Sequence, residues 1–214
     1  MQNTPIRAVL WDFGGVILSS PFQAFNRYEA EKGLPKDLIR RVNATDPDTN
    51  AWALLERNEI SPALFDVMFA EESERLGHRV PGADVLALLA GEVRPEMVRA
   101  LDTVIGNGYL TACLTNNVVS SDAPRDARAE AVRAVMDRFH QVIESSKVGC
   151  RKPEPRFYEI ACGALGVSPT ECVFLDDLGI NLKPAAAMGM RTIKVDDPGV
   201  ALRELSGHLG LELD

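Results

Sequence analysis

Short, continuous apolar runs recur along the chain, and most of them end in polar or acidic residues. A run of about four to eight apolar, β-prone residues bounded by turn residues is typical of a strand buried on both faces of a parallel sheet. Five segments fit this description and are predicted to be strands: Arg7–Asp12, Tyr109–Thr115, His140–Glu144, Cys172–Leu175 and Arg191–Val195.

Segments with helical spacing of apolar residues separate the later strands. Pro95–Gly106 is the clearest, because Met97, Leu101 and Val104 recur on one side and Gly106 can end the helix. The other segments of this kind are Ala123–Phe139, Pro155–Gly166 and Asn181–Gly189. Alternating strands and helices predict an α/β protein with a Rossmann-like, doubly wound and mainly parallel sheet that helices cover on both faces.

The stretch from about Pro21 to Ala90 differs, because it holds successive helical patterns and no convincing strand. The expected helices are Phe22–Lys32, Leu34–Val42, Asn50–Asn58, Ser61–Leu76 and Ala83–Ala90. This block directly follows the first strand, so we expect a helical cap inserted beside the carboxyl ends of the strands. The predicted division is a core domain of residues 1–17 and 93–214 with a cap of residues 18–92, hinged at Ile17–Pro21 and Gly91–Pro95.

Composition limits the partners. The 214 residues carry a formal net charge of −8, which argues against nucleic acid or an anionic membrane as a partner, because both require a basic surface. No apolar run approaches the roughly 20 residues that cross a bilayer, and no signal peptide opens the chain. We expect a soluble, cytoplasmic protein whose four cysteines are buried free thiols. The sequence leaves a monomer and a homodimer open, as it leaves open whether Trp52, Phe65, Met68 and Phe69 form the cap core or a dimer stripe.

Polar residues with catalytic potential follow several of the predicted strands. Asp12 ends the first strand and precedes two glycines, and Thr115-Asn116 ends the second. Lys152 lies in a proline-stiffened loop before a helix, and Asp176-Asp177 follow the fourth strand. Ligands of open α/β sheets bind at the carboxyl ends of the strands. Each feature alone also suits an ordinary turn or a solvated charge, although two adjacent carboxylates are unfavourable unless a cation neutralises one.

Taken in order, these features resemble the haloacid dehalogenase-like hydrolase superfamily over essentially the whole chain, including the helical cap. More narrowly, the chain is similar to the group that contains the N-terminal phosphatase domain of soluble epoxide hydrolase and the related domain fused to some acyl-CoA dehydrogenases. The segments that carry the resemblance are Trp11–Ile17, Leu114–Asn117, Val142–Ser146 with Gly149, Lys152–Pro155 and Val173–Lys183.

The resemblance implies a phosphatase that works with Mg²⁺. Asp12 would attack phosphorus and become an aspartyl phosphate. The metal ligands would be the carboxylates of Asp12 and Asp177 and the backbone carbonyl of Gly14. The substrate would be a small phosphorylated metabolite.

The resemblance also implies supporting roles around this centre. Thr115, the Asn116 backbone and Lys152 would hold the phosphoryl oxygens, and Lys152 would also keep Asp12 ionised. Asp176 would orient Lys152 or a metal-bound water. Asn181 stands where many relatives carry another acid, and it would orient the metal shell.

One position departs from the family pattern. The phosphatases of the superfamily usually carry an acid–base Asp two residues after the nucleophile, where this chain has Gly14. General acid–base catalysis contributes roughly 10²–10⁴-fold, so we expect a slow phosphatase or one that favours good leaving groups. Alternatively, the substrate or a cap residue supplies the proton, and Glu29, Asp46 and Glu56 are the cap residues considered.

Other functions stay open at this point. A dehalogenase-type hydrolase would use Asp12 to displace a halide through an ester intermediate and would need no metal, although such enzymes tend to carry an aromatic residue where Gly14 stands. A module that binds phosphorylated ligands or a protein partner, with little catalysis, would explain the missing acid–base residue. A phosphoryl transferase to an acceptor other than water is a further alternative.

Overall fold

A parallel β-sheet forms the centre of the protein. The computed structural model describes residues 4–118 and 126–213. Its five strands follow the order β3-β2-β1-β4-β5, and every neighbouring pair is parallel. The strands are β1 (Ala8–Trp11), β2 (Leu110–Thr115), β3 (Gln141–Glu144), β4 (Cys172–Asp176) and β5 (Arg191–Lys194). All five predicted strands are therefore confirmed, and the first strand of the chain lies in the middle of the sheet.

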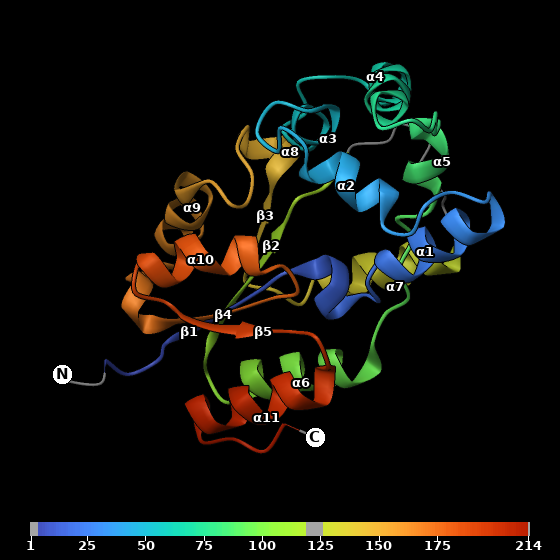
Figure 1. The fold of residues 1–214 in the computed structure, drawn as a ribbon. Coiled ribbons are helices and arrows are strands. Elements are labelled where there is room, and N and C mark those ends of the chain that lie inside the picture. The colour runs from blue at the N-terminus through green and yellow to red at the C-terminus, as the bar shows by residue number, and fades with distance from the viewer. Residues whose placement is uncertain (1–3, 119–125, 214) are drawn as a thin grey trace.

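Helices cover both faces of this sheet (Figure 1). Alternate residues of β1 point to opposite sides, so Val9 and Trp11 join one buried apolar cluster and Ala8 and Leu10 the other. The helices that follow the cap in the chain are α6 (Pro95–Gly106), α7 (Ala127–Met136), α8 (Ser145–Val148), α9 (Pro155–Leu165), α10 (Gly179–Ala187) and α11 (Pro198–Leu209). The α/β, Rossmann-like fold expected from the alternating pattern is present.

Five α-helices occupy the region between β1 and α6: α1 (Phe22–Glu31), α2 (Leu38–Ala44), α3 (Ala51–Glu56), α4 (Pro62–Arg75) and α5 (Gly82–Ala87). They share a separate apolar cluster that includes the fully buried Phe65 and Phe69. These two residues therefore belong to the interior of the cap and not to an exposed stripe. The domain boundaries themselves stay a prediction.

The two segments that enter and leave the cap lie side by side. Leu18 and Val93 form an antiparallel bridge, and the Ser19 N–H donates to the Glu92 carbonyl at 2.8 Å. The Ser19 hydroxyl in turn accepts from the Glu92 N–H at 2.9 Å. The two hinges expected from the sequence are thus joined by hydrogen bonds.

Several helix boundaries differ from the sequence prediction. Helix α2 starts at Leu38 and not at Leu34, because Asp37 takes a left-handed conformation (φ 61°) that a helix does not tolerate. The start predicted for α7 at residues 123–125 lies outside the described residues. Helices α8 and α11 were not predicted, although Asp197 caps α11 by accepting from the Val200 N–H and Pro198 occupies its first position.

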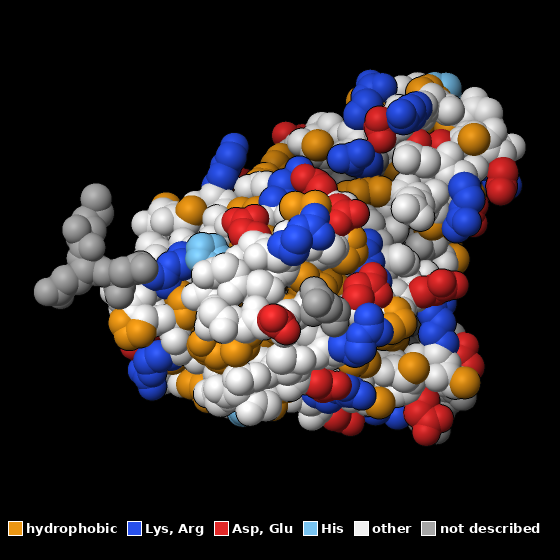
Figure 2. Space-filling view, turned by 90° about the horizontal axis from the view of Figure 1, so that it is seen from below, with side chains coloured by type: hydrophobic (Ala, Val, Ile, Leu, Met, Phe, Trp, Pro, Cys, Tyr) orange, Lys and Arg blue, Asp and Glu red, His pale blue; other side chains and the backbone are white. Residues whose placement is uncertain are grey.

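The remaining expectations concern thiols and surfaces. All four cysteines are free and buried, as predicted. Acidic and basic side chains are interspersed over the face seen in Figure 2, and its described residues form no continuous basic area. Among residues 4–118 and 126–213, no helix has the length and apolar character that a membrane span requires.

Candidate active site

Asp12 follows the central strand β1 and lies at the carboxyl edge of the sheet. Its carboxylate is buried, with 7% of the residue exposed. Oδ1 accepts hydrogen bonds from the Phe13 N–H at 2.6 Å and from the Lys152 ammonium at 2.7 Å. In the described part of the chain no donor reaches the second oxygen, Oδ2. That oxygen is the atom of Asp12 that is free to react or to bind a ligand.

Lys152 reaches the site from the loop between α8 and α9. Its ammonium lies 2.7 Å from Asp12 and 2.8 Å from Asp176 Oδ2, and only 1% of its side chain is exposed. A fully buried lysine is unusual unless carboxylates neutralise it. The long side chain therefore connects two strand ends through one buried cation.

Asp176 and Asp177 have different surroundings although they are adjacent. Asp176 ends β4 and is fully buried. Its oxygens accept from Lys152, from the Leu178 N–H at 2.8 Å and from the Asn181 side-chain amide at 3.0 and 3.1 Å. Asp177 Oδ2 receives one long hydrogen bond, from the Ser20 hydroxyl at 3.4 Å. Asp176 is thus held by protein donors, whereas Asp177 keeps most of its capacity for a ligand.

The three carboxylates at this edge fit a divalent cation. One oxygen each of Asp12, Asp176 and Asp177 lies within 4.8 Å of the others. Three carboxylates face a single ammonium, that of Lys152, so negative charge is in excess. Hard oxygen donors of this kind are the ligands that Mg²⁺ prefers. Because the oxygens of Asp176 are already engaged, Asp12 and Asp177 are the side chains best able to hold the ion.

The glycine loop after Asp12 makes room for this arrangement. Gly15 has a φ of 81°, which favours glycine, and a Cβ there would lie 2.5 Å from Asp177 Cγ. A side chain at Gly15 would therefore displace the Asp177 carboxylate. At Gly14, by contrast, an added Cβ would meet no atom within 4 Å.

The electrostatics of the cluster follow from burial and from repulsion between carboxylates. Burial raises the pKa of Asp12 well above its usual range, and Lys152 opposes this while Asp176 reinforces it. Burial and then the charge of Asp176 raise the pKa of Asp177 to about 6. Burial by itself lowers the pKa of Lys152, but Asp12 and Asp176 outweigh it and hold the pKa above its usual value. The lysine is therefore charged, and the cluster gains from a further cation.

Thr115 and Asn116 bring the second strand to the same edge. Thr115 ends β2, which pairs with β1, and 7% of it is exposed. The side-chain amide of Asn116 holds the main chain of Lys152: its Oδ1 accepts from the Lys152 N–H at 2.9 Å and its Nδ2 donates to the Lys152 carbonyl at 3.0 Å. The sequence suggested a role only for the Asn116 backbone, and nothing in the sequence indicated this side-chain contact.

The three cap acids considered as proton donors lie in different places. Glu29 is buried inside the cap, where it accepts from the N–H groups of Asp37 and Ile39 at 2.7 and 2.9 Å. Asp46 is exposed. Glu56 contacts the loops around the site, because its Oε2 accepts from Asn116 at 3.1 Å and from Arg151 at 2.6 Å. Burial raises the pKa of Glu56, and Arg151 opposes that shift.

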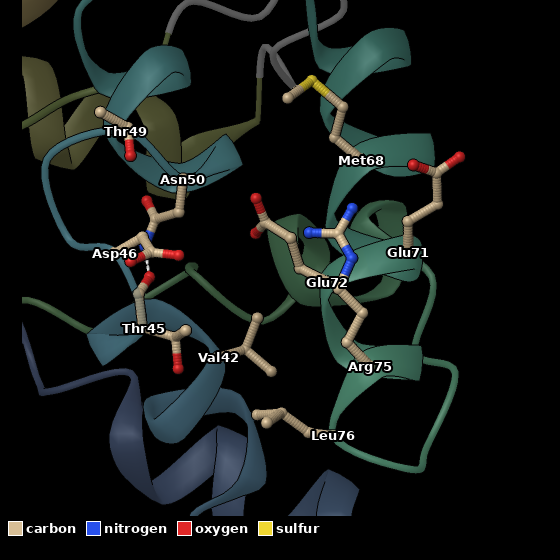
Figure 3. Close-up of a pocket in the computed structure, with 10 residues that line it drawn as sticks. All are labelled: Val42, Thr45, Asp46, Thr49, Asn50, Met68, Glu71, Glu72, Arg75 and Leu76. Carbon is tan, nitrogen blue, oxygen red and sulfur yellow. Dashed lines mark hydrogen bonds between the residues drawn. The ribbon is translucent and has the colours of Figure 1, made fainter.

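Two hollows are lined by cap residues. A cavity of about 360 Å³ lies in the cap between the α2–α3 segment and α4, and Figure 3 shows Glu72 and Arg75 directed into it from α4. Cap residues line it, so it is separate from the carboxylate cluster. A second hollow, of about 220 Å³, is lined by Ser20 and Arg27 among others. Its lining also comes from residues 19–92 and includes no member of the carboxylate cluster, although Ser20 donates to Asp177.

The chain is similar to several known proteins. The family model of haloacid dehalogenase-like hydrolases matches residues 6–189. The chain is 34% identical to mouse "Acyl-CoA dehydrogenase family member 10" and 33% identical to pig "Bifunctional epoxide hydrolase 2", in each case over 97% of this chain. It spans only 19% and 40% of the lengths of those two relatives.

Two further relatives match over most of their length. "Phosphatase MT3486" of Mycobacterium tuberculosis is 32% identical over 98% of this chain and 97% of its own. A HAD family enzyme from Bacteroides thetaiotaomicron, solved in complex with magnesium and inorganic phosphate, superposes with a TM-score of 0.56 at 21% identity over 88% of this chain and 93% of its own. That structural likeness concerns the fold alone. From the family match and the first three relatives together, this chain belongs to the haloacid dehalogenase-like hydrolases.

Proposed function

We propose that the protein is a Mg²⁺-dependent phosphatase that acts on a small phosphorylated metabolite through an aspartyl phosphate at Asp12. The observation that carries this proposal is the buried Lys152 ammonium between Asp12 and Asp176, in a cluster where three carboxylates face one cation. An anionic phosphoryl group needs an ionised nucleophile and compensating positive charge at the same place. The haloacid dehalogenase-like family and the relative named as a phosphatase support the same reaction.

Asp12 would perform the first step with its free oxygen, Oδ2. A bond forms between this oxygen and phosphorus, and the bond from phosphorus to the leaving oxygen breaks. Lys152, the Thr115 hydroxyl and the Asn116 N–H would hold the non-reacting phosphoryl oxygens. Water then attacks the aspartyl phosphate, which releases inorganic phosphate and restores the Asp12 carboxylate.

The metal would be held by Asp12 and Asp177, with the Gly14 carbonyl as the third protein ligand. When bound, Mg²⁺ would offset the negative charge that gathers between the carboxylates and the phosphoryl group. Asn181 fixes Asp176 through two hydrogen bonds, and Asp176 in turn fixes Lys152. Asp176 and Asn181 would thus position the lysine and not the substrate.

The absence of an acid at position 14 sets the expected rate and substrate preference. No side chain at that position can protonate the leaving oxygen or activate the water. Substrates whose leaving oxygen departs without a proton, such as aryl and acyl phosphates, would be favoured.

A second function is favoured by the same glycine. A module that binds phosphorylated ligands with little turnover would keep Lys152, Thr115 and Asp177 but would not need the acid–base residue. Under either function we predict a cytoplasmic location and no nucleic-acid partner.

The deciding experiment measures hydrolysis of para-nitrophenyl phosphate with Mg²⁺, with EDTA, and with the Asp12→Asn variant. The phosphatase predicts turnover that requires Mg²⁺ and falls by about 10³-fold or more in Asp12→Asn. Calorimetric titration with Mg²⁺ and inorganic phosphate tests whether the variant still binds both. Binding without turnover in the wild-type protein would favour the ligand-binding module instead.

A further inference from the structure

Glu56 is a buried cap residue whose charged partner belongs to the core. It is the last residue of α3, and 6% of it is exposed. Oε1 accepts from the indole of Trp52 at 2.8 Å, within the cap. Oε2 accepts from Arg151 at 2.6 Å and from Asn116 at 3.1 Å, both of which lie in core loops. Its side chain is therefore held from both sides of the boundary between cap and core.

The two core partners of Glu56 hold the main chain of Lys152. Asn116 grips the Lys152 N–H and carbonyl at 2.9 and 3.0 Å. The guanidinium of Arg151 also donates to the Lys152 carbonyl, at 3.3 Å. From this fixed main chain the Lys152 side chain extends to Asp12 and Asp176. A continuous series of hydrogen bonds thus runs from a cap carboxylate to the cation of the site.

Two main-chain contacts keep the end of α3 in the same place. The Ser145 hydroxyl donates to the Glu56 carbonyl at 2.5 Å and accepts from the Asn117 N–H at 3.0 Å. Arg151 also donates to the Pro47 carbonyl, in the cap segment before α3, at 2.6 Å. The end of α3 and the segment before it therefore contact the loop after β2, the start of α8 and the loop before α9 together. If α3 moved away with the cap, all three segments would lose partners in one step.

We propose that Glu56 is a positioning residue that couples the observed position of the cap to the placement of Lys152. The inference deepens the proposed phosphatase function and rests on it for its effect on turnover. With the cap in the observed position, Glu56 neutralises Arg151 and orients the Asn116 amide, so the Lys152 main chain is fixed. With the cap displaced, Asn116 and Arg151 lose their common acceptor, and Lys152 is no longer held where Asp12 requires it.

The test compares Glu56→Gln with Asp84→Asn as a matched control. Asp84 is also a cap carboxylate in a short hydrogen bond, 2.7 Å from the Tyr28 hydroxyl, but this partner lies inside the cap. Hydrogen–deuterium exchange is measured for peptides that cover residues 113–118 and 149–153. Affinity for inorganic phosphate is measured by calorimetry in the presence of Mg²⁺, together with kcat and KM for para-nitrophenyl phosphate.

For Glu56→Gln we expect faster exchange in both core segments. Phosphate affinity should be about tenfold weaker and kcat about tenfold lower, which is a common effect of removing a residue that orients the ligands of a site through hydrogen bonds. Asp84→Asn should leave these quantities unchanged. Exchange that increases only in the cap, with phosphate affinity as in the wild-type protein, would overturn the coupling. If the wild-type protein showed no turnover, the phosphatase proposal would fail, whereas exchange and phosphate affinity would still decide the coupling.

A double variant separates loss of the coupling from loss of stability. Glu56→Gln leaves Arg151 buried without a counter-charge, which destabilises a protein. Glu56→Gln with Arg151→Met removes both charges, so thermal stability should return toward the wild-type value. We expect exchange near Lys152 to stay fast in the double variant, because neither partner then connects the cap to the loop. Slow, wild-type exchange there would contradict the proposal.

Discussion

The core and the cap use their buried polar side chains differently. In the core most of these side chains gather at one edge of the sheet, where Lys152 contacts both Asp12 and Asp176. In the cap they satisfy nearby main-chain groups: Asn50 accepts from the Ala53 N–H, and Ser73 bonds to the Val80 N–H. Glu29 acts in the same way within the cap.

This difference separates structural from chemical uses of the same residue types. A buried carboxylate that accepts from main-chain N–H groups completes the ends of helices. A buried carboxylate that faces a lysine and two more carboxylates is unfavourable for folding and is characteristic of a site. Glu56 is the exception in the cap, because it pairs with core loops, and this exception is what assigns it a role at the site.

The largest expected effect comes from replacing a glycine of positive φ by alanine in each of the two regions. Gly15 in the core and Gly33 in the cap both have positive φ, 81° and 65°. Gly15→Ala would also push aside Asp177, whereas Gly33→Ala meets nothing within 4 Å. Both substitutions should lower the free energy of unfolding by about 1–2 kcal/mol through backbone strain.

Only Gly15→Ala should also impair function, with turnover and Mg²⁺ affinity about 100-fold lower. Calorimetric titration with Mg²⁺ and urea denaturation of both variants would check this. Equal activity in the two variants would show that the observed position of Asp177 is not needed for function. The core carboxylates would then not differ functionally from the buried polar side chains of the cap.

An intermediate effect is expected from restoring an acid to the core. Gly14 has open space where a side chain would begin, and its φ of −72° is one that other residues adopt readily. Gly14→Asp should therefore fold and should raise turnover of para-nitrophenyl phosphate by about tenfold or more, since acid–base catalysis contributes up to roughly 10⁴-fold. Burst kinetics would show whether hydrolysis of the aspartyl phosphate is the step that accelerates. Unchanged kinetics in a folded, Mg²⁺-binding variant would indicate that another group already transfers the proton.

The smallest expected effect is a pH dependence of the contact between cap and core. Burial raises the pKa of Glu56 above its ordinary 4.5, against the opposing charges of Arg151 and Lys152. A carboxyl with a raised folded-state pKa holds its proton more firmly when folded than when unfolded. Its contribution to stability is therefore complete below the ordinary pKa and is lost as the pH rises through the folded value.

Wild-type stability should accordingly fall relative to that of Glu56→Gln as the pH rises above 4.5. Urea denaturation of both proteins across this range measures the difference. If the difference in free energy of unfolding did not change with pH, Glu56 would have the same pKa in the folded and the unfolded chain. The contact between cap and core would then not shift its pKa.

The sequence was sufficient to predict the sheet. Its strands are continuous apolar runs buried on both faces, so Ala8–Trp11 and Cys172–Asp176 were recognisable without any tertiary information. The cap helices were located less accurately, since short helices depend on local conformations such as the left-handed Asp37 before α2. The candidate site residues could also be predicted, because each acid follows a strand and Lys152 lies before a helix.

Local sequence determined that Asp12 and Asp177 stand at the carboxyl ends of parallel strands and that Lys152 lies in a loop before a helix, which led to the expectation that the three would meet. Only the tertiary structure decided which cap carboxylate reaches the loops around them, where Glu56 contacts Asn116 and Arg151. Glu29, Asp46 and Glu56 are all acidic residues of the cap, and the sequence does not distinguish them. Their surroundings depend on how the cap packs on segments from distant parts of the chain. Contacts such as that between Glu56 and Arg151 join residues 95 positions apart, and no local pattern encodes such a pairing because its energy arises only when both side chains are buried together.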